Sequence, residues 1–147
     1  MHEDVSKLIR DQKIEEISTS RETIQVLLDD ATRHIASSQT LAVSADMHGA
    51  FQLAYDSTRK SCAALLNYYG YRATNRGGHF AVFDCAGKLI DSISDELDGL
   101  QETRRLRNAM EYPGDTRLFL NGDDVSEAID LAVRVRRIAR SVLTFED

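Results

Sequence analysis

The chain has 147 residues, of which 42% are hydrophobic and 29% charged, proportions that are ordinary for a soluble globular protein. One proline and eight glycines are too few for a collagen-like or linker-rich chain, and no apolar run approaches the ~20 residues of a membrane-spanning helix. With 18 basic and 24 acidic residues, the net charge of −6 excludes a uniformly basic nucleic-acid coat but leaves room for a local basic patch. The composition therefore predicts a single domain over residues 1–147 without a membrane segment.

The first part of the chain predicts two helices. Apolar residues from Val5 to Ile17 follow a helical period imperfectly, so residues 1–18 are expected to hold an accessory helix. Thr19 and Glu22 have the spacing of a capping box ahead of a second helix. That helix is expected over residues 21–37, with its apolar side chains on one face.

A longer helix is predicted over residues 46–69. Ser44 or Asp46 can cap its start, and Gly70 can stop it. Residues 74–78, Thr-Asn-Arg-Gly-Gly, are the clearest loop in the chain. The apolar run at residues 80–83 is compatible with a strand, but we predict a short helix over residues 79–90 because the neighbouring segments are helical.

The C-terminal part predicts two further helices. The first spans about residues 92–112 and ends before Pro113, which disfavours helical geometry at Tyr112. Asp123 or Asp124 is expected to cap the second, which reaches about residue 143. Together the elements predict an all-α fold, an antiparallel up-and-down four-helix bundle with one or two accessory N-terminal helices.

The two cysteines, Cys62 and Cys85, are too few for a disulfide framework and form no CxxC pair. We expect both thiols to be buried and to pack as small apolar groups. Reduced thiols are typical of a cytoplasmic protein, which is the location the sequence predicts. The chain also lacks metal-ligand spacings and a glycine-rich phosphate loop, so neither a metal nor a cofactor is expected.

An arginine-rich segment in the helix over residues 92–112 has the most specific chemical pattern. On a helical wheel Arg107 falls inside the apolar arc, and Arg104 lies at its edge. A guanidinium cannot stay unpaired in a dry core, so it must meet a carboxylate, a polar groove or a second subunit. One interpretation is a structural ion pair with an acid such as Asp56, Asp95 or Glu96. The other is that Arg107 holds a phosphate, with Asn108 orienting it or bonding RNA.

This segment resembles the HEPN superfamily, whose helical bundle has a motif of Arg, a polar residue and, a few residues later, His. Arg107 and Asn108 match the start of the motif, and Tyr112 stands where the His would be. The preceding helix with Tyr55 and Arg59, and the Arg-Gly-Gly-His turn at residues 76–79, also look like the family. The resemblance covers about residues 46–145.

The resemblance implies a metal-independent endoribonuclease, often a toxin, that works as a dimer with two motifs meeting across the interface. In that chemistry a ribose 2′-hydroxyl attacks the adjacent phosphate, the His moves protons, and the Arg stabilises the charged phosphorane. A phenol keeps its proton at neutral pH, so Tyr112 can donate a hydrogen bond but is a poor base. Family members without the His are generally regarded as binding or partner modules.

His79 is the candidate substitute for the missing imidazole, because the two glycines before it allow a close backbone approach. The alternative is a hydrogen-bonded His at a helix start. Arg104, Arg76 and Tyr55 are the candidate RNA-contacting residues. The arginines of the last helix either track phosphates or only complement the helix dipole; they are Arg134, Arg136, Arg137 and Arg140.

The leading hypothesis is a dimeric HEPN-like protein that binds RNA or a nucleic-acid-linked partner at the Arg107–Asn108 groove. It includes a metal-independent endoribonuclease with a toxin or defence role. The first alternative is a non-catalytic or antitoxin-like module whose acidic surplus faces a basic partner protein, such as a nucleotidyltransferase. The second is a structural homodimer in which Arg107 closes a core ion pair.

Overall fold

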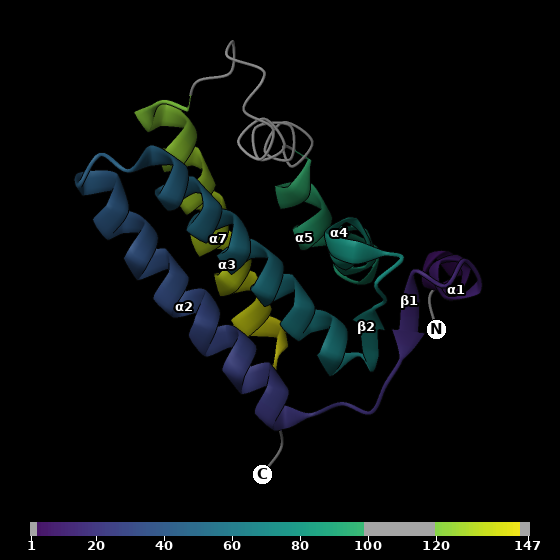
Figure 1. Cartoon of the computed structure of the whole chain (residues 1–147). Coiled ribbons are helices and arrows are strands. Elements are labelled where there is room, and N and C mark those ends of the chain that lie inside the picture. The colour runs from purple at the N-terminus through teal and green to yellow at the C-terminus, as the bar shows by residue number, and fades with distance from the viewer. Residues whose placement is uncertain (1–2, 99–119, 145–147) are drawn as a thin grey trace.

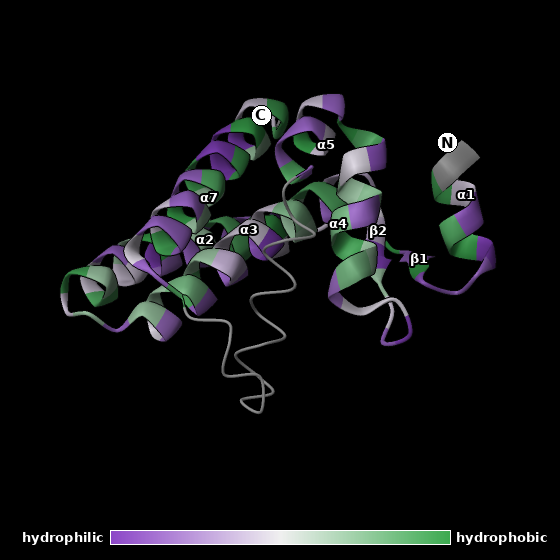
Figure 2. Cartoon of the chain, turned by 90° about the horizontal axis from the view of Figure 1, so that it is seen from above, coloured by the Kyte–Doolittle hydropathy of each residue, from purple (hydrophilic) through white to green (hydrophobic). Residues whose placement is uncertain are grey.

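The computed structural model describes residues 3–98 and 120–144 (Figure 1). The helices are α1 (Glu3–Arg10), α2 (Arg21–Val43), α3 (Met47–Tyr68), α4 (Gly78–Leu89), α5 (Asp91–Leu97) and α7 (Gly122–Val142). The strands are β1 (Ile14–Glu16) and β2 (Tyr71–Ala73). Helix α3 packs against α2, α7 and α4 (Figure 2). The predicted helical bundle is therefore confirmed, with a small antiparallel strand pair added to it.

The N-terminal segment does not form the single helix predicted over residues 3–18. Helix α1 ends at Arg10, and Gln12 adopts a positive φ of 60°, which breaks the helical path. The chain then forms β1, whose Ile14 pairs with Ala73 of β2 and is buried in the core. This pairing places the turn at residues 74–77 next to the end of α1, where the backbone N–H of Thr74 donates to the carbonyl of Lys13 at 3.0 Å.

Helix α2 begins at Arg21, as predicted, but its capping residue and its C-terminal end differ from the prediction. Its N-cap is Ser20, whose hydroxyl accepts from the backbone N–H of Thr23, and the predicted cap Thr19 instead donates to the carbonyl of Asn67 at 2.9 Å. The helix continues past residue 37 to Val43, because Ser38 is buried and its hydroxyl donates to the carbonyl of Ala50 at 2.6 Å. The buried hydroxyl of Ser38 therefore links α2 to α3 through a hydrogen bond.

The boundaries of the later helices follow the sequence more closely. Asp46 caps α3, as expected, and Gly70 ends it with a φ of +85°. Residues 78–89 are helical, so the short helix predicted there is confirmed over the strand. The helix predicted over residues 92–112 starts as α5, and residues 99–119 lie outside the described residues. The cap of α7 is Asn121, which forms a capping box with Asp124, rather than Asp123 or Asp124 alone.

The buried side chains form two clusters on either end of α3. The larger cluster joins α1, α3, α4 and α5 to the C-terminal half of α7, and it contains both cysteines, as predicted. The smaller cluster surrounds Phe51 and Val125, where α3 meets the first half of α7. Across residues 3–98 and 120–144, no helix combines the length and the apolar character needed to cross a membrane. Helix α3 is therefore packed on several sides by the core, and the second half of this helix also forms one wall of a pocket.

Candidate functional site

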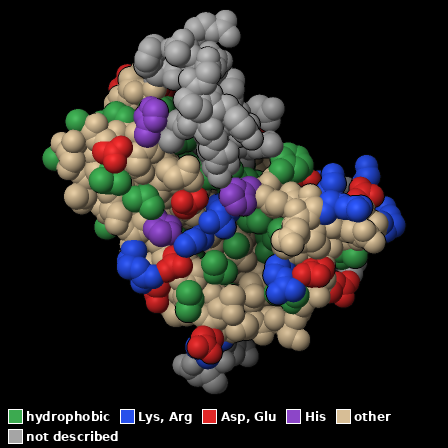
Figure 3. Space-filling model, in the orientation of Figure 1, with side chains coloured by type: hydrophobic (Ala, Val, Ile, Leu, Met, Phe, Trp, Pro, Cys, Tyr) green, Lys and Arg blue, Asp and Glu red, His purple; other side chains and the backbone are tan. Residues whose placement is uncertain are grey.

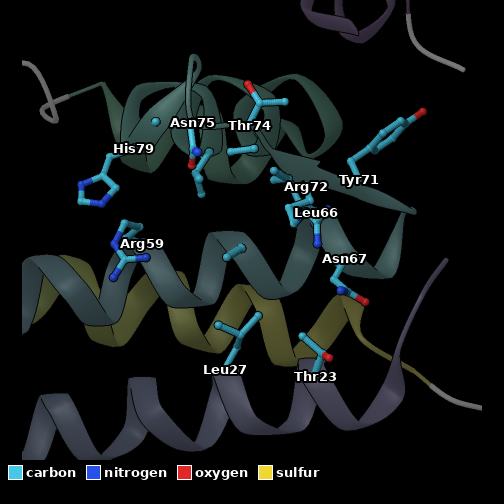
Figure 4. Close-up of a pocket in the computed structure, with 14 residues that line it drawn as sticks. Thr23, Leu27, Arg59, Leu66, Asn67, Tyr71, Arg72, Thr74, Asn75 and His79 are labelled. Carbon is cyan, nitrogen blue, oxygen red and sulfur yellow. The ribbon is translucent and has the colours of Figure 1, made fainter. Parts of the chain in front are cut away.

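A pocket of about 450 Å³ lies between α2, the second half of α3, β2 and the start of α4 (Figure 4). Its aliphatic lining comes from Leu27, Ala63, Leu66, Ala73 and Val82, and its polar lining from Thr23, Arg59, Asn67, Arg72, Thr74, Asn75 and His79, with Tyr71 and Gly78 completing the wall. Segments far apart in the sequence therefore build one pocket with both an apolar and a charged part.

Arg59 has unsatisfied hydrogen-bonding capacity at one end of this pocket. Its Nε atom is buried and has no hydrogen-bond partner among the described residues. Its Nη2 atom lies 3.9 Å from a carboxylate oxygen of Asp56, which also accepts from Gln52 at 3.2 Å. A guanidinium has five N–H donors, and leaving a buried donor unpaired costs free energy. An anion bound at this end would satisfy those donors.

His79, in the first turn of α4, lies beside Arg59 of α3. Figure 4 shows the imidazole and the guanidinium facing each other at the same end of the pocket. The His79 ring is 6.2 Å from the ring of Tyr55, which packs edge-on against Phe83 at 5.5 Å. Tyr55 and Phe83 are buried and His79 is exposed, so the imidazole lies against a fixed aromatic pair and stays open to solvent. Two of the predicted site residues, Tyr55 and His79, are therefore brought together.

Arg72 lies at the opposite end of the pocket, where its charge is already compensated. Its Nε and Nη2 atoms donate to one carboxylate oxygen of Glu15 at 2.9 and 2.6 Å, across the strand pair. The predicted RNA-contacting residue Arg76 is exposed in the turn before α4 and does not line the pocket. Within the described residues, the guanidinium that keeps an unpartnered N–H group is therefore that of Arg59, with His79 beside it.

Asn67 is held in one orientation at the Arg72 end. Its side-chain oxygen accepts from the backbone N–H of Ser20 at 2.8 Å, and the residue is buried. With the oxygen used in this way, the amino group is the part of the side chain that remains to donate within the pocket. The sequence analysis did not identify Asn67, since its partner is 47 residues away along the chain.

A second polar cluster lies between α2 and α3 and is closed by its own contacts. The ammonium group of Lys60 is 3.1 Å from Asp30 and 2.9 Å from Nε2 of His34. The hydrogen bond from Lys60 lowers the pKa of Asp30, whereas burial, and then the charge of Lys60, lower the pKa of His34. Figure 3 shows charged and histidine side chains adjoining on this face. Lys60 therefore holds the two helices together.

The arginine-rich segment that resembles the HEPN motif lies within residues 99–119, outside the described residues. Arg104, Arg107, Asn108 and Tyr112 all lie outside the described residues. Two of the acids considered as partners of Arg107 have other contacts, since Glu96 accepts from Arg134 at 2.6 Å and Asp56 faces Arg59. The ion-pair and phosphate interpretations of Arg107 both remain predictions.

The described ranges contain no group of three or more His, Cys, Asp or Glu side chains arranged to hold a metal ion. Comparison of the chain with protein-family models, with curated proteins and with solved structures yields no match. The site must therefore be interpreted from its own geometry, and the resemblance to the HEPN superfamily stays a prediction.

Proposed function

We propose that this protein binds single-stranded RNA, with one phosphate held by Arg59 beside His79. The observation that supports this most is the buried Nε atom of Arg59 at the end of a pocket, which has no hydrogen-bond partner in residues 3–98 and 120–144. The planar fork of a guanidinium matches the oxygens of a phosphate. A single strand fits better than a duplex, because its unstacked bases can reach apolar and aromatic side chains.

The net charge of −6 supports a local site rather than a broad basic surface. We include in the proposal the HEPN-like relationship, a homodimer, a cytoplasmic location and a toxin or defence role, as the sequence predicts. A partner protein such as a nucleotidyltransferase belongs to the alternative in which the chain is a non-catalytic module. The two forms differ in whether the bound RNA is cut.

Cleavage is the stronger form of the proposal, and the position of His79 favours it. An imidazole next to a phosphate-binding guanidinium provides proton transfer and charge stabilisation at one place. The 2′-hydroxyl of the RNA would give its proton to a base and form a bond to the phosphorus, while the bond from phosphorus to the 5′-oxygen breaks and that oxygen takes up a proton. The products would be a 2′,3′-cyclic phosphate and a 5′-hydroxyl. Arg107, Asn108 and Tyr112 remain the residues that the family resemblance assigns to this step.

Binding is tested by fluorescence anisotropy of a labelled single-stranded RNA with wild type, Arg59→Gln and Arg137→Gln. Arg137 is an exposed arginine of α7 outside the pocket, so its variant removes the same charge elsewhere. Losing a charged hydrogen-bonding group should weaken binding at least about tenfold in Arg59→Gln. Arg137→Gln should stay within about twofold of wild type. Equal losses in both variants, or no binding by wild type at low salt, would refute the proposal.

Cleavage is tested on the same RNA in the presence of EDTA, with products separated on a denaturing gel. Metal-independent cutting that disappears in Arg107→Ala and His79→Ala, while circular dichroism shows both variants folded, would establish the catalytic form. Binding by the wild type without cutting would establish the non-catalytic form.

A further inference from the structure

We infer that the pocket receives one unstacked base of the bound RNA, with the phosphate at Arg59 and an edge of the base on the amino group of Asn67. This inference rests on the proposed function and specifies which part of the RNA enters the site. It adds a specificity residue, Asn67, that the resemblance to a known family does not provide.

The size of the pocket suits a single nucleotide. Its volume of about 450 Å³ lies toward the lower end of the range, about 300–1,000 Å³, of pockets that enclose small ligands. Such a volume accommodates a single base with its ribose better than a stack of several bases. Figure 4 shows the pocket bounded by α2 on one side and by the turn before α4 on the other.

The distribution of polar groups along the pocket determines how a ligand would be oriented in it. Arg59 forms the cationic end, with His79 beside it, while Glu15 already neutralises Arg72 at the other end. Between the two ends lie aliphatic side chains, among them Leu66 and Val82, which are both buried. A ligand with an anionic group at one end and a flat apolar body matches this order.

The fixed amide of Asn67 provides a hydrogen-bond donor for the base. Its oxygen accepts from the backbone N–H of Ser20, which fixes the orientation of the amide and leaves the amino group as its donor toward a ligand. Every nucleobase has ring-nitrogen or carbonyl acceptors on its edge, and a ribose phosphate without a base has none there. Asn67 should therefore distinguish a nucleotide from a bare sugar phosphate.

The test compares adenosine 5′-monophosphate with ribose 5-phosphate, each titrated into nitrogen-15-labelled protein and followed by NMR. Both probes have the phosphate, and only the first has a base. Wild type should bind the nucleotide at least about fivefold more tightly, as one net hydrogen bond and the apolar contact require. In Asn67→Asp an oxygen still accepts from Ser20, but the amino donor is lost. The apolar contact remains in this variant, so its preference for the nucleotide should fall about fivefold from the wild-type value, the share of one net hydrogen bond.

The outcomes separate this inference from the proposed function. Equal affinity of wild type for the two probes would overturn the base pocket, even if Arg59 proves necessary for RNA binding. An unchanged preference for the nucleotide in Asn67→Asp would overturn the role of Asn67. Failure of wild type to bind labelled RNA in the anisotropy experiment would overturn the proposed function itself, whatever the two small probes do.

Discussion

Replacing Gly77 with alanine would test how tightly the start of α4 packs on the turn that follows α1. A Cβ atom at this position would lie 2.2 Å from the carbonyl oxygen of Lys13 and 2.6 Å from the Cβ of Ala81. The first distance is far shorter than the 3.4 Å at which ordinary van der Waals contact begins. The Lys13 oxygen cannot simply withdraw, because it also accepts from the backbone N–H of Thr74.

The cost of this substitution should be steric. The φ angle of Gly77 is −74°, which any residue adopts, so no backbone strain is added. Overpacking of this kind costs about 1–3 kcal/mol, and the stiffer unfolded chain offsets about 0.4–1 kcal/mol of it. We expect Gly77→Ala to lower the free energy of unfolding by roughly 1–2 kcal/mol.

The matched control is Gly122→Ala at the first residue of α7, where a Cβ would meet nothing within 4 Å among the described atoms. This variant should be neutral or stabilised by up to about 1 kcal/mol. Both free energies are measured by urea unfolding followed by circular dichroism at 222 nm. Because α4 positions His79 beside Arg59, Gly77→Ala should also weaken RNA binding more than the control does. If Gly77→Ala proves as stable as Gly122→Ala, the close packing of α4 on Lys13 is wrong.

Three further predictions concern titration, reactivity and the core. The pKa of His34 is lowered from its ordinary value of 6.5, so the unfolded chain takes up the proton more readily than the folded chain. The free energy of unfolding should therefore be full above about pH 6.5 and fall below it. In urea unfolding at a series of pH values, His34→Gln should remove this part of the pH dependence. An unchanged pH dependence would contradict the partial burial of His34 and its contact with Lys60. Burial raises the pKa of the Cys62 and Cys85 thiols to about 12 each. Iodoacetamide at pH 8 should therefore label neither thiol in the native protein and both in urea. Rapid labelling of the native protein, detected by mass spectrometry, would refute their burial. Phe51 is 1% exposed, and Phe51→Ala should cost about 3–5 kcal/mol in urea unfolding, whereas a loss below about 1 kcal/mol would contradict its place in the smaller core cluster.

The helices with long amphipathic patterns could be predicted from the sequence, since their signal is local. The helix over residues 46–69 was identified with its cap Asp46 and its stop Gly70, because both signals lie next to the apolar pattern. The strand pair was missed for two physical reasons. Each strand has only three residues, too short for a period, and the pairing of Ile14 with Ala73 is long-range. The extension of α2 was missed because Ser38 is satisfied by a carbonyl of another helix.

The site could be predicted only in part. Tyr55 and His79 were identified from the family resemblance, and the structure places their rings in contact. Arg59 was noticed only as part of the same pattern, since its unpartnered Nε atom depends on the packing around it. Asn67 gave no sequence signal, because its orientation is set by Ser20 from a distant segment. Arg72 could be noticed as a basic residue near the glycine turn, but its ion pair with Glu15 is long-range and could not be predicted.

Photo-crosslinking is the most direct test that RNA occupies this pocket. A single-stranded RNA containing 4-thiouridine is irradiated with the wild-type protein, and the cross-linked tryptic peptides are identified by mass spectrometry. Binding at the pocket predicts cross-links in the peptides over residues 61–72 and 77–88, which contain Asn67 and His79, and loss of both in Arg59→Gln. Cross-links confined to the arginine-rich peptides of α7, and unchanged in Arg59→Gln, would contradict it.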